Sequence, residues 1–221
     1  MKHSVFLSHV TWSQTETEIR LQGMNQDEQQ QALRYTHPLR LRSFVASRLL
    51  LKQALNLLNH SQHDWLFRKA NGRLVMENST ANWHISLSHT NDYVACLLSP
   101  QTYCGIDLEQ RIDKPSFLAI AERFFSINES SYLQQLDEDQ AFTCFLDWWT
   151  RKEACIKAWH VGIAHHLASI EFSPNQLSPI RFPISHQHLP LTLHTIASQD
   201  WQLACAVHDT DPEWHIQNIA L

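Results

Sequence analysis

The chain of 221 residues lacks any long apolar run, because charged or polar residues interrupt its hydrophobic segments well before a bilayer-spanning length. Residues 1–7 also lack the long apolar stretch and the small-residue cleavage site of a secretory signal. A hydrophobic content of 43% is ordinary for a globular protein and argues against disorder. We therefore expect a folded, cytoplasmic protein without a membrane segment.

Paired cysteines and an excess of basic charge are missing as well. The five cysteines are odd in number and contain no C-x-x-C pair, which favours reduced, buried thiols. Seventeen Lys and Arg against 22 Asp and Glu give a net charge of −5, which argues against a general nucleic-acid binder. Fifteen histidines are present, but no Cys or carboxylate stands at a metal-ligand spacing that would favour zinc. This net charge suits a protein that recognises one small anionic ligand locally.

Hydrophobic periodicity predicts a mixture of helices and antiparallel strands, which is typical of an α+β fold. The turn signal Asn71-Gly72 introduces an extended stretch at 73–76, and Gly162 is expected to end the last helix. Residues 11–24 read as a polar stretch without a predicted element. The predicted strands cover residues 4–10, 83–89, 93–98, 104–109, 191–197 and 201–207, and the predicted helices cover 25–35, 39–58, 117–125, 129–136 and 141–160.

The first chemical signature is G-I-D-L-E, from Gly105 to Glu109. Side chains alternate between the two faces of a strand, so Ile106 and Leu108 can point into a core while Asp107 and Glu109 share the opposite face. Taken alone, this short pattern is more typical of a strand that ends at a surface turn.

The second signature is W-T-R-K-E-A-C-I-K, at residues 149–157. Glu153 and Lys157 are four residues apart and share one face of the predicted helix, where they could also form an ordinary surface pair. Together with Asp107 and Glu109, they offer three carboxylates and a lysine to one site. Hard oxygen ligands and a cation are the groups that Mg²⁺ and a pyrophosphate require.

These two signatures resemble the paired signature of the phosphopantetheinyl transferases, specifically the Sfp-type group that activates carrier proteins. Residues 85–89, I-S-L-S-H, and residues 123–126, R-F-F-S, resemble two further blocks of that family. Four blocks in the family's order argue against coincidence. The resemblance implies two similar α/β lobes related by a pseudo-twofold axis, with the cofactor in the cleft between them. The lobes would cover 1–103 and 104–221, with the boundary near Tyr103, and a monomer would suffice.

The resemblance also implies the reaction. A 4′-phosphopantetheinyl transferase, or holo-acyl-carrier-protein synthase, moves the phosphopantetheine arm of coenzyme A to a serine of an apo acyl, peptidyl or polyketide carrier protein. Adenosine 3′,5′-bisphosphate leaves. The metal ligands would be Asp107, Glu109 and Glu153, and Lys157 would stabilise negative charge beside them. Whether Glu153 or a metal-bound water removes the serine proton stays open, as does the choice of carrier protein.

Coenzyme A would need cationic and hydroxyl partners for its phosphates. Arg73 stands where the family has Lys followed by Pro, and Leu74 replaces that proline here. The register of the basic helix, which carries Arg40, Arg42 and Arg48, stays open. The residues expected to bind coenzyme A are Arg42, Arg48, Arg73, Ser88, His89, Lys152 and Lys157.

Two other classes of function fit parts of the sequence. Metal-dependent nucleases use an Asp followed by Glu-x-Lys, and Asp107, Glu109 and Arg111 form a distorted version that leaves the helix signature unexplained. A non-catalytic coenzyme A or carrier-binding protein of the same fold is the other alternative. The intact carboxylates and lysine of both signatures favour the enzyme.

Overall fold

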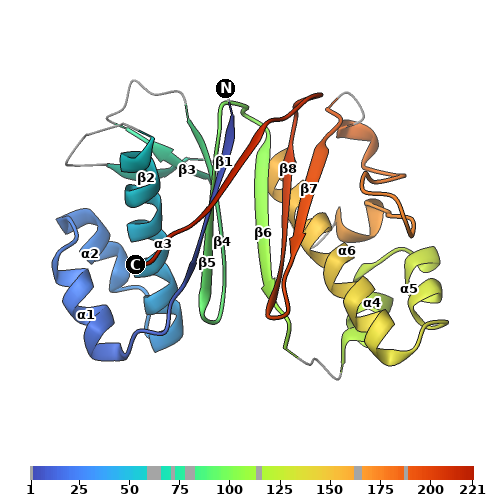
Figure 1. Ribbon diagram of the computed structural model, residues 1–221, viewed down its shortest axis with the longest axis horizontal. Helices are drawn as coiled ribbons and strands as arrows, with labels where there is room; N and C mark the ends of the chain where they lie inside the picture. Colours follow the sequence, from blue (N-terminus) through green and yellow to red (C-terminus); the bar gives the residue numbers. More distant parts are fainter. Residues whose placement is uncertain are drawn as a thin grey trace.

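The computed structural model describes residues 2–58, 66–70, 73–77, 83–112, 116–161, 166–186 and 189–221. Two β-sheets stand side by side in the middle of the molecule, and helices cover the outer face of each (Figure 1). The protein is therefore an α+β protein, as its sequence predicts, and its helices and sheets form four layers. Among the described residues, none of the helices could serve as a membrane span.

The first half of the chain builds a sheet in which β5 lies between β4 and β1, with three helices on its outer face. The longest of these helices buries Val45, Leu50 and Leu51 against Phe6 of the sheet. A separate two-stranded hairpin, β2 and β3, lies beside it. The elements are β1 (His3–His9), α1 (Gln14–Gln22), α2 (Gln26–Ala32), α3 (Pro38–Leu57), β2 (Phe67–Ala70), β3 (Arg73–Met76), β4 (His84–Thr90) and β5 (Tyr93–Ser99).

The second half builds a sheet with the order β6-β8-β7, covered by α4, α5 and α6. If the β2–β3 hairpin and β9 are set aside, the first strand of each half pairs with the third, and the third pairs with the second. The helices of each half come between its first and second strands along the chain. The last strand, β9, leaves its own half and pairs in parallel with β1. The elements are β6 (Cys104–Gln110), α4 (Phe117–Phe124), α5 (Ile127–Leu133), α6 (Glu138–Trp159), β7 (Thr192–Ala197), β8 (Trp201–Val207) and β9 (Trp214–Asn218), with short 3₁₀ turns at Leu167–Ser169 and Ile184–His186.

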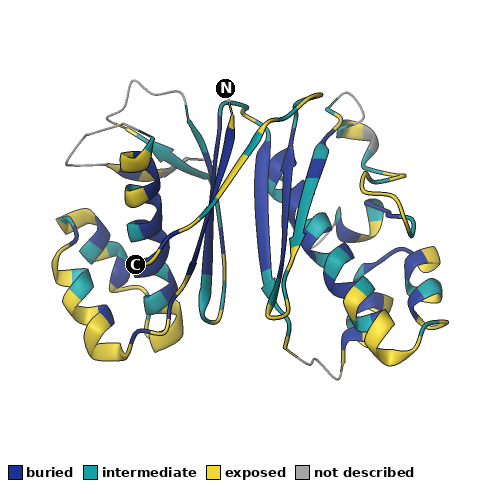
Figure 2. Cartoon of the chain, viewed as in Figure 1, coloured by how far each residue is buried: buried dark blue, intermediate teal, exposed yellow. Residues whose placement is uncertain are grey.

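The inner faces of the two sheets share one apolar core, which is buried along the central strands (Figure 2). Val5 and Leu97 of the first sheet pack in it together with Ile106, Leu108 and Leu203 of the second. Ile106 and Leu108 are at most 1% exposed. The alternation predicted for the G-I-D-L-E strand is therefore confirmed on its core face.

A row of hydroxyls joins the edges of the two sheets. Along β4, the side chains of Ser86, Ser88 and Thr90 accept hydrogen bonds from the backbone N–H groups of Ile106, Leu108 and Gln110 on β6, at 3.0, 3.2 and 3.3 Å. The two-residue spacing of the hydroxyls matches the spacing at which a strand presents its N–H groups on one edge. Side chains thus satisfy an edge that would otherwise expose unpaired donors.

Three observed elements, α1, β2 and β9, have no counterpart among the predicted ones. Helix α1 forms where only a polar stretch was expected, and it begins with a capping box between Ser13 and Glu16. Strand β9 was not predicted, because its residues are half-buried or exposed and lack a buried face. Helix α6 ends at Trp159, and His160 is its left-handed C-cap. The turn at 71–72 and the predicted stop at Gly162 lie outside the described residues.

Candidate functional site

Gly105 explains why the two signatures meet. A Cβ built on Gly105 would lie 2.1 Å from the carbonyl oxygen of Ala154 and 2.6 Å from the amide nitrogen of Ala158. Only a glycine lets the backbone of β6 approach helix α6 this closely. Because side chains alternate along a strand, Asp107 and Glu109 lie on the same face as Gly105, toward α6.

Lys157 on α6 reaches this face of the strand. Its Nζ donates to Asp107 Oδ1 at 2.7 Å, to the carbonyl oxygen of Ile106 at 3.0 Å and to Ser88 Oγ at 3.1 Å. Ser88 Oγ in turn donates to Asp107 Oδ1 at 2.9 Å. The structure therefore brings residues from three sequence blocks together, and Glu153 is 4.0 Å from the same Lys157 nitrogen.

The Asp107 carboxylate is buried, and one of its oxygens lacks a partner. Asp107 is 3% exposed, and its Oδ2 has no hydrogen-bond partner among the described residues. A buried oxygen without a donor is unusual and indicates a ligand that completes it. Glu109 and Glu153 are half-buried. Within the described ranges, no three His, Cys, Asp or Glu side chains are grouped closely enough to hold a metal ion by themselves.

A cavity of about 670 Å³ opens beside Lys157. Helix α3 and strands β3 and β4 form one wall, and β6 and the end of α6 form the other. Four cationic side chains line it, and no carboxylate is among its described lining residues. A neighbouring cavity of about 320 Å³ shares Arg40 and His89 with it. The cationic and histidine side chains of the larger cavity are Arg40, Arg48, Arg73, Lys157, His89 and His160.

Arg48 is a buried cation in this wall. It is 4% exposed, and its Nε has no hydrogen-bond partner among the described residues. The rings of Phe44 and Phe67 lie 5.2 and 5.7 Å from its guanidinium carbon. Burial lowers the pKa of Arg48, because it removes the charged guanidinium from water. An anion bound in the cavity would offset the free-energy cost of this desolvation. The pKa of His89 is also lowered, first by burial and then by the charge of Lys157.

The model of the 4′-phosphopantetheinyl transferase superfamily matches residues 103–206, which contain both signatures and the R-F-F-S block. This match covers just under half of the chain, and over that part the chain is similar to the superfamily. Phosphopantetheinyl transferase Sfp of Bacillus subtilis is 33% identical over 132 residues, which are 59% of this chain and 58% of that protein. A Synechocystis sp. protein provisionally named a 4′-phosphopantetheinyl transferase is 28% identical over 76% of this chain and 66% of its own length.

The match therefore spans about three fifths to two thirds of the length of these curated relatives. Among solved structures, a holo-(acyl-carrier-protein) synthase from Bacillus anthracis, in complex with coenzyme A, is 21% identical. That match covers 48% of this chain and 95% of the other, with a TM-score of 0.41.

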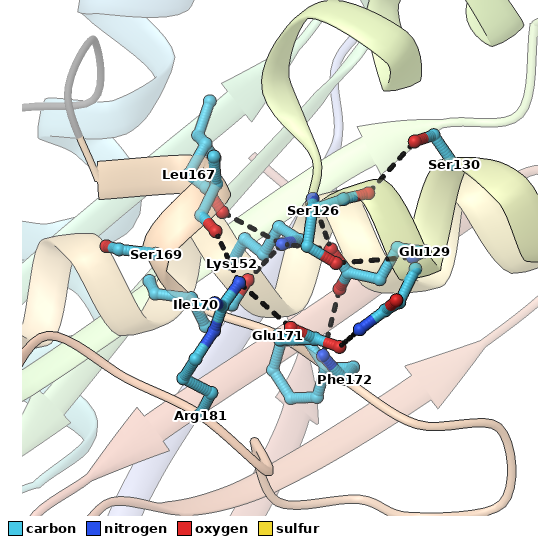
Figure 3. Close-up of polar contacts among 12 residues, drawn as sticks. Ser126, Glu129, Ser130, Lys152, Leu167, Ser169, Ile170, Glu171, Phe172 and Arg181 are labelled. Carbon is cyan, nitrogen blue, oxygen red and sulfur yellow. Dashed lines mark hydrogen bonds and ion pairs between the residues drawn. The ribbon is translucent and has the colours of Figure 1, made fainter.

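Lys152 does not reach the cavity. It is fully buried on α6 and donates to Glu129 Oε2 and to the carbonyl oxygen of Leu167, both at 2.8 Å, and also to the carbonyl oxygen of Ile170 (Figure 3). Three acceptors use all three protons of the ammonium group. The geometry gives Lys152 a packing role between α6 and α5 in place of the expected contact with coenzyme A.

Glu129 and the R-F-F-S block complete this packing. Glu129 accepts from the backbone N–H of Ser126 and of Phe172, both at 2.9 Å, and caps α5. The ring of Phe125 lies 4.7 Å from Lys152 Nζ. Two residues of the R-F-F-S block thus take part in this packing, Phe125 beside the lysine and Ser126 beside Glu129.

Arg42 also lies away from the cavity. It forms an ion pair with Asp92, and its Nη1 donates to the carbonyl oxygen of Trp12 at 3.3 Å. Arg40, two residues earlier and therefore about 200° around the helix, lines both cavities instead. Arg48, Arg73 and His89 line the larger cavity as expected.

Ser88 and His160 complete the comparison with the expectations. The Ser88 hydroxyl bonds Asp107, Lys157 and the N–H of Leu108, which occupies its one proton and both of its lone pairs. His160 lines the cavity but was read from the sequence as a helix end only. No sequence signal separates a capping histidine from one that faces a ligand.

Proposed function

We propose that this protein transfers the 4′-phosphopantetheine arm of coenzyme A to a serine hydroxyl of an apo carrier protein. The observation that carries the proposal is the meeting of Lys157, Asp107 and Ser88 at the edge of a cavity lined by cations. Coenzyme A carries a pyrophosphate and a ribose phosphate. A chain with a net charge of −5 has no general reason to gather four cations around one cavity.

The proposed binding mode follows from where the charges lie. Lys157 stands at the junction of the cavity and the carboxylates, so the pyrophosphate is expected beside it. Arg48 and Arg73 line the same cavity, and their guanidinium groups suit phosphate oxygens. Arg40 and His89 border both cavities and are the groups proposed for the ribose phosphate.

The carboxylates fit a magnesium ion by their chemistry. The donor set consists of hard oxygens, and the unpartnered Oδ2 of buried Asp107 is available for a cation. Mg²⁺ commonly takes one or two protein carboxylates and fills its other positions with water and substrate phosphate, so a preformed three-ligand cluster is not required. We propose Asp107, Glu109 and Glu153 as its ligands. When bound, Mg²⁺ neutralises charge on the pyrophosphate oxygens.

The chain's own residues would then support an in-line displacement. The carrier serine oxygen forms a bond to the phosphorus next to the pantetheine arm, and the bond from that phosphorus to the bridging oxygen breaks. Adenosine 3′,5′-bisphosphate leaves with that oxygen. Lys157 lines the cavity and is held by three acceptors, so it would stabilise the developing negative charge through its own charge, without a further hydrogen bond. The proton of the serine passes to Glu153 or to a water beside it.

The two halves of the chain are proposed to be lobes related by a pseudo-twofold axis. Their support is the shared order of pairing, first strand to third and third to second, in residues 1–103 and in the part of 104–221 that ends with β8. The return of β9 to β1 ties the two lobes together. The cavity, with one wall from each lobe, is then the cleft between them.

Intact-protein mass spectrometry tests the function. An apo acyl carrier protein and an apo peptidyl carrier protein are each incubated with this protein, coenzyme A and MgCl₂. We expect a mass gain of one phosphopantetheine arm that is lost with EDTA or with Asp107→Ala and is retained with Glu213→Gln, a change at an exposed carboxylate. No gain on either carrier, with coenzyme A bound and the protein folded, would leave a binding protein and refute the proposed transfer.

A further inference from the structure

His160 holds a backbone conformation that favours glycine. It is the C-cap of α6, with φ 60° and ψ 36°. Helices commonly end in this left-handed conformation, and the residue there is usually Gly and sometimes Asn. Two other described non-glycine residues have positive φ, Asn91 and Asn175, and asparagine tolerates this region well. A strained residue at a cavity wall points to a function for its side chain.

The imidazole of His160 is held in place on one side. Its ring stacks on the ring of Tyr103, with centroids 5.3 Å apart and planes 18° apart. A backbone hydrogen bond with Thr102 raises its pKa, as a carbonyl acceptor does. One ring nitrogen therefore carries the proton toward Thr102, and the other is left as an acceptor.

The surroundings of His160 keep this ring neutral. Burial, and then the charge of Arg73, lower the pKa of His160 to about 4. A neutral imidazole with a free lone pair is a poor partner for a phosphate and a suitable partner for a base that offers an N–H. Phosphates in the same cavity have Arg40, Arg48, Arg73 and Lys157 as partners. Of the parts of coenzyme A, the adenine base is aromatic, uncharged and carries an amino donor.

We propose that His160 contacts the adenine base of coenzyme A and helps this protein to select adenine over other bases. The proposal rests on the proposed function, because that function supplies the ligand. Tyr103 supports the imidazole from behind, so that His160 presents a rigid ring and one acceptor nitrogen to the cavity. The left-handed backbone is the local cost of placing the ring there.

Calorimetric titration of the full chain with adenosine 3′,5′-bisphosphate and inosine 3′,5′-bisphosphate tests this role. The inosine compound replaces the amino donor with a carbonyl. We expect the native protein to prefer the adenine compound. His160→Gly should weaken adenine binding about tenfold, within the range that one hydrogen bond contributes, and should abolish the preference. His160→Asn should behave likewise, because it keeps a residue suited to the backbone and removes the ring.

Two controls separate this role from a structural one. Without ligand, His160→Gly should melt at or above the temperature of the native protein, because glycine relieves the left-handed strain. The ring of His208 packs edge-on against the same Tyr103 ring, with centroids 6.2 Å apart, but His208 does not line the cavity. His208→Gln should therefore bind both nucleotides as the native protein does.

Three outcomes would overturn the assignment. Unchanged adenine binding by His160→Gly would show that the ring makes no contact. Equal weakening of inorganic pyrophosphate binding would show that it acts on phosphates or on the fold. Failure of the native protein to bind either nucleotide would refute the proposed function itself, and that result is distinct from the other two.

Discussion

Replacing Gly105 with alanine tests whether the contact between β6 and α6 builds the site. The added Cβ would meet two backbone atoms of α6, at 2.1 and 2.6 Å, and neither can rotate away as a side chain does. Ordinary contact begins near 3.4 Å, so the strand and helix must separate by roughly 1.3 Å. Overpacking of this kind lies at the upper end of the usual range, about 3 kcal/mol, which corresponds to a loss of about 6–12 °C in melting temperature.

The same separation would disturb the chemistry. Lys157 bridges from α6 to Asp107 at 2.7 Å and to the carbonyl oxygen of Ile106 at 3.0 Å, and a displacement of 1 Å exceeds what either bond tolerates. A misplacement of about 1 Å can cost about 10²-fold in rate. Transfer measured by mass spectrometry, at a temperature where the variant is folded, should fall by that factor.

Gly23 provides the matched control. It also lies next to a helix, but its added Cβ would meet only the Arg20 carbonyl oxygen, at 3.5 Å, in ordinary contact. Gly23→Ala should therefore change stability by less than about 0.5 kcal/mol and leave transfer intact. If Gly105→Ala matched Gly23→Ala in melting temperature and in rate, the reasoning about the strand and helix would be wrong.

Three further changes have expected outcomes. Asp107→Asn removes the charge that faces Lys157 and should lower the rate of phosphopantetheine transfer by about 10²–10³-fold in the mass-spectrometric assay. Its melting temperature should be nearly unchanged. Lys152→Met leaves the Glu129 carboxylate buried without its cation, so the free energy of unfolding measured in urea should fall by about 3–5 kcal/mol. A second change in the same chain, Glu129→Gln, should recover part of that stability. His160 titrates near pH 4 when folded and near its ordinary 6.5 when unfolded, so the unfolded chain binds more protons between these values. Melting temperature should therefore fall as pH drops from 7 to 4, and His160→Gly should reduce that slope.

Each of these expectations can fail in a recognisable way. Full transfer by Asp107→Asn would remove this carboxylate from the reaction. Stability of Lys152→Met equal to that of the native protein would mean that the buried charge of Glu129 costs little. An identical pH slope in His160→Gly would assign the acid sensitivity to another group.

Periodicity was sufficient to predict most of the elements around the site. Strands at 104–109 and 201–207 and the helix at 141–160 were placed within a few residues, because each has one strongly apolar face. Helix α1 was not predicted, because its buried residues are too few to give it such a face, although its Ser13 and Glu16 capping box was readable. Strand β9 lacks a buried face altogether and is defined by its pairing with β1.

The candidate site could be predicted where side chains share one element and less well where elements must meet. The alternation in β6 placed Asp107 correctly relative to Ile106. Position around a helix was harder, because each residue turns the side chain by about 100°. Lys152, next to Glu153 in the sequence, therefore points into the packing against α5, and Arg40 replaces Arg42 at the cavity.

Ser88 couples the contact between the two sheets to the candidate site. Its hydroxyl belongs to the row that fastens β4 to β6, and the same oxygen bonds Asp107 and Lys157. The oxygen that links the two sheets is therefore also part of the candidate site. If the two halves opened at this seam, Ser88 would lose its hydrogen bonds to Asp107 and Lys157, which both belong to the second half. Loss of activity and loss of structure on heating should accordingly be a single event.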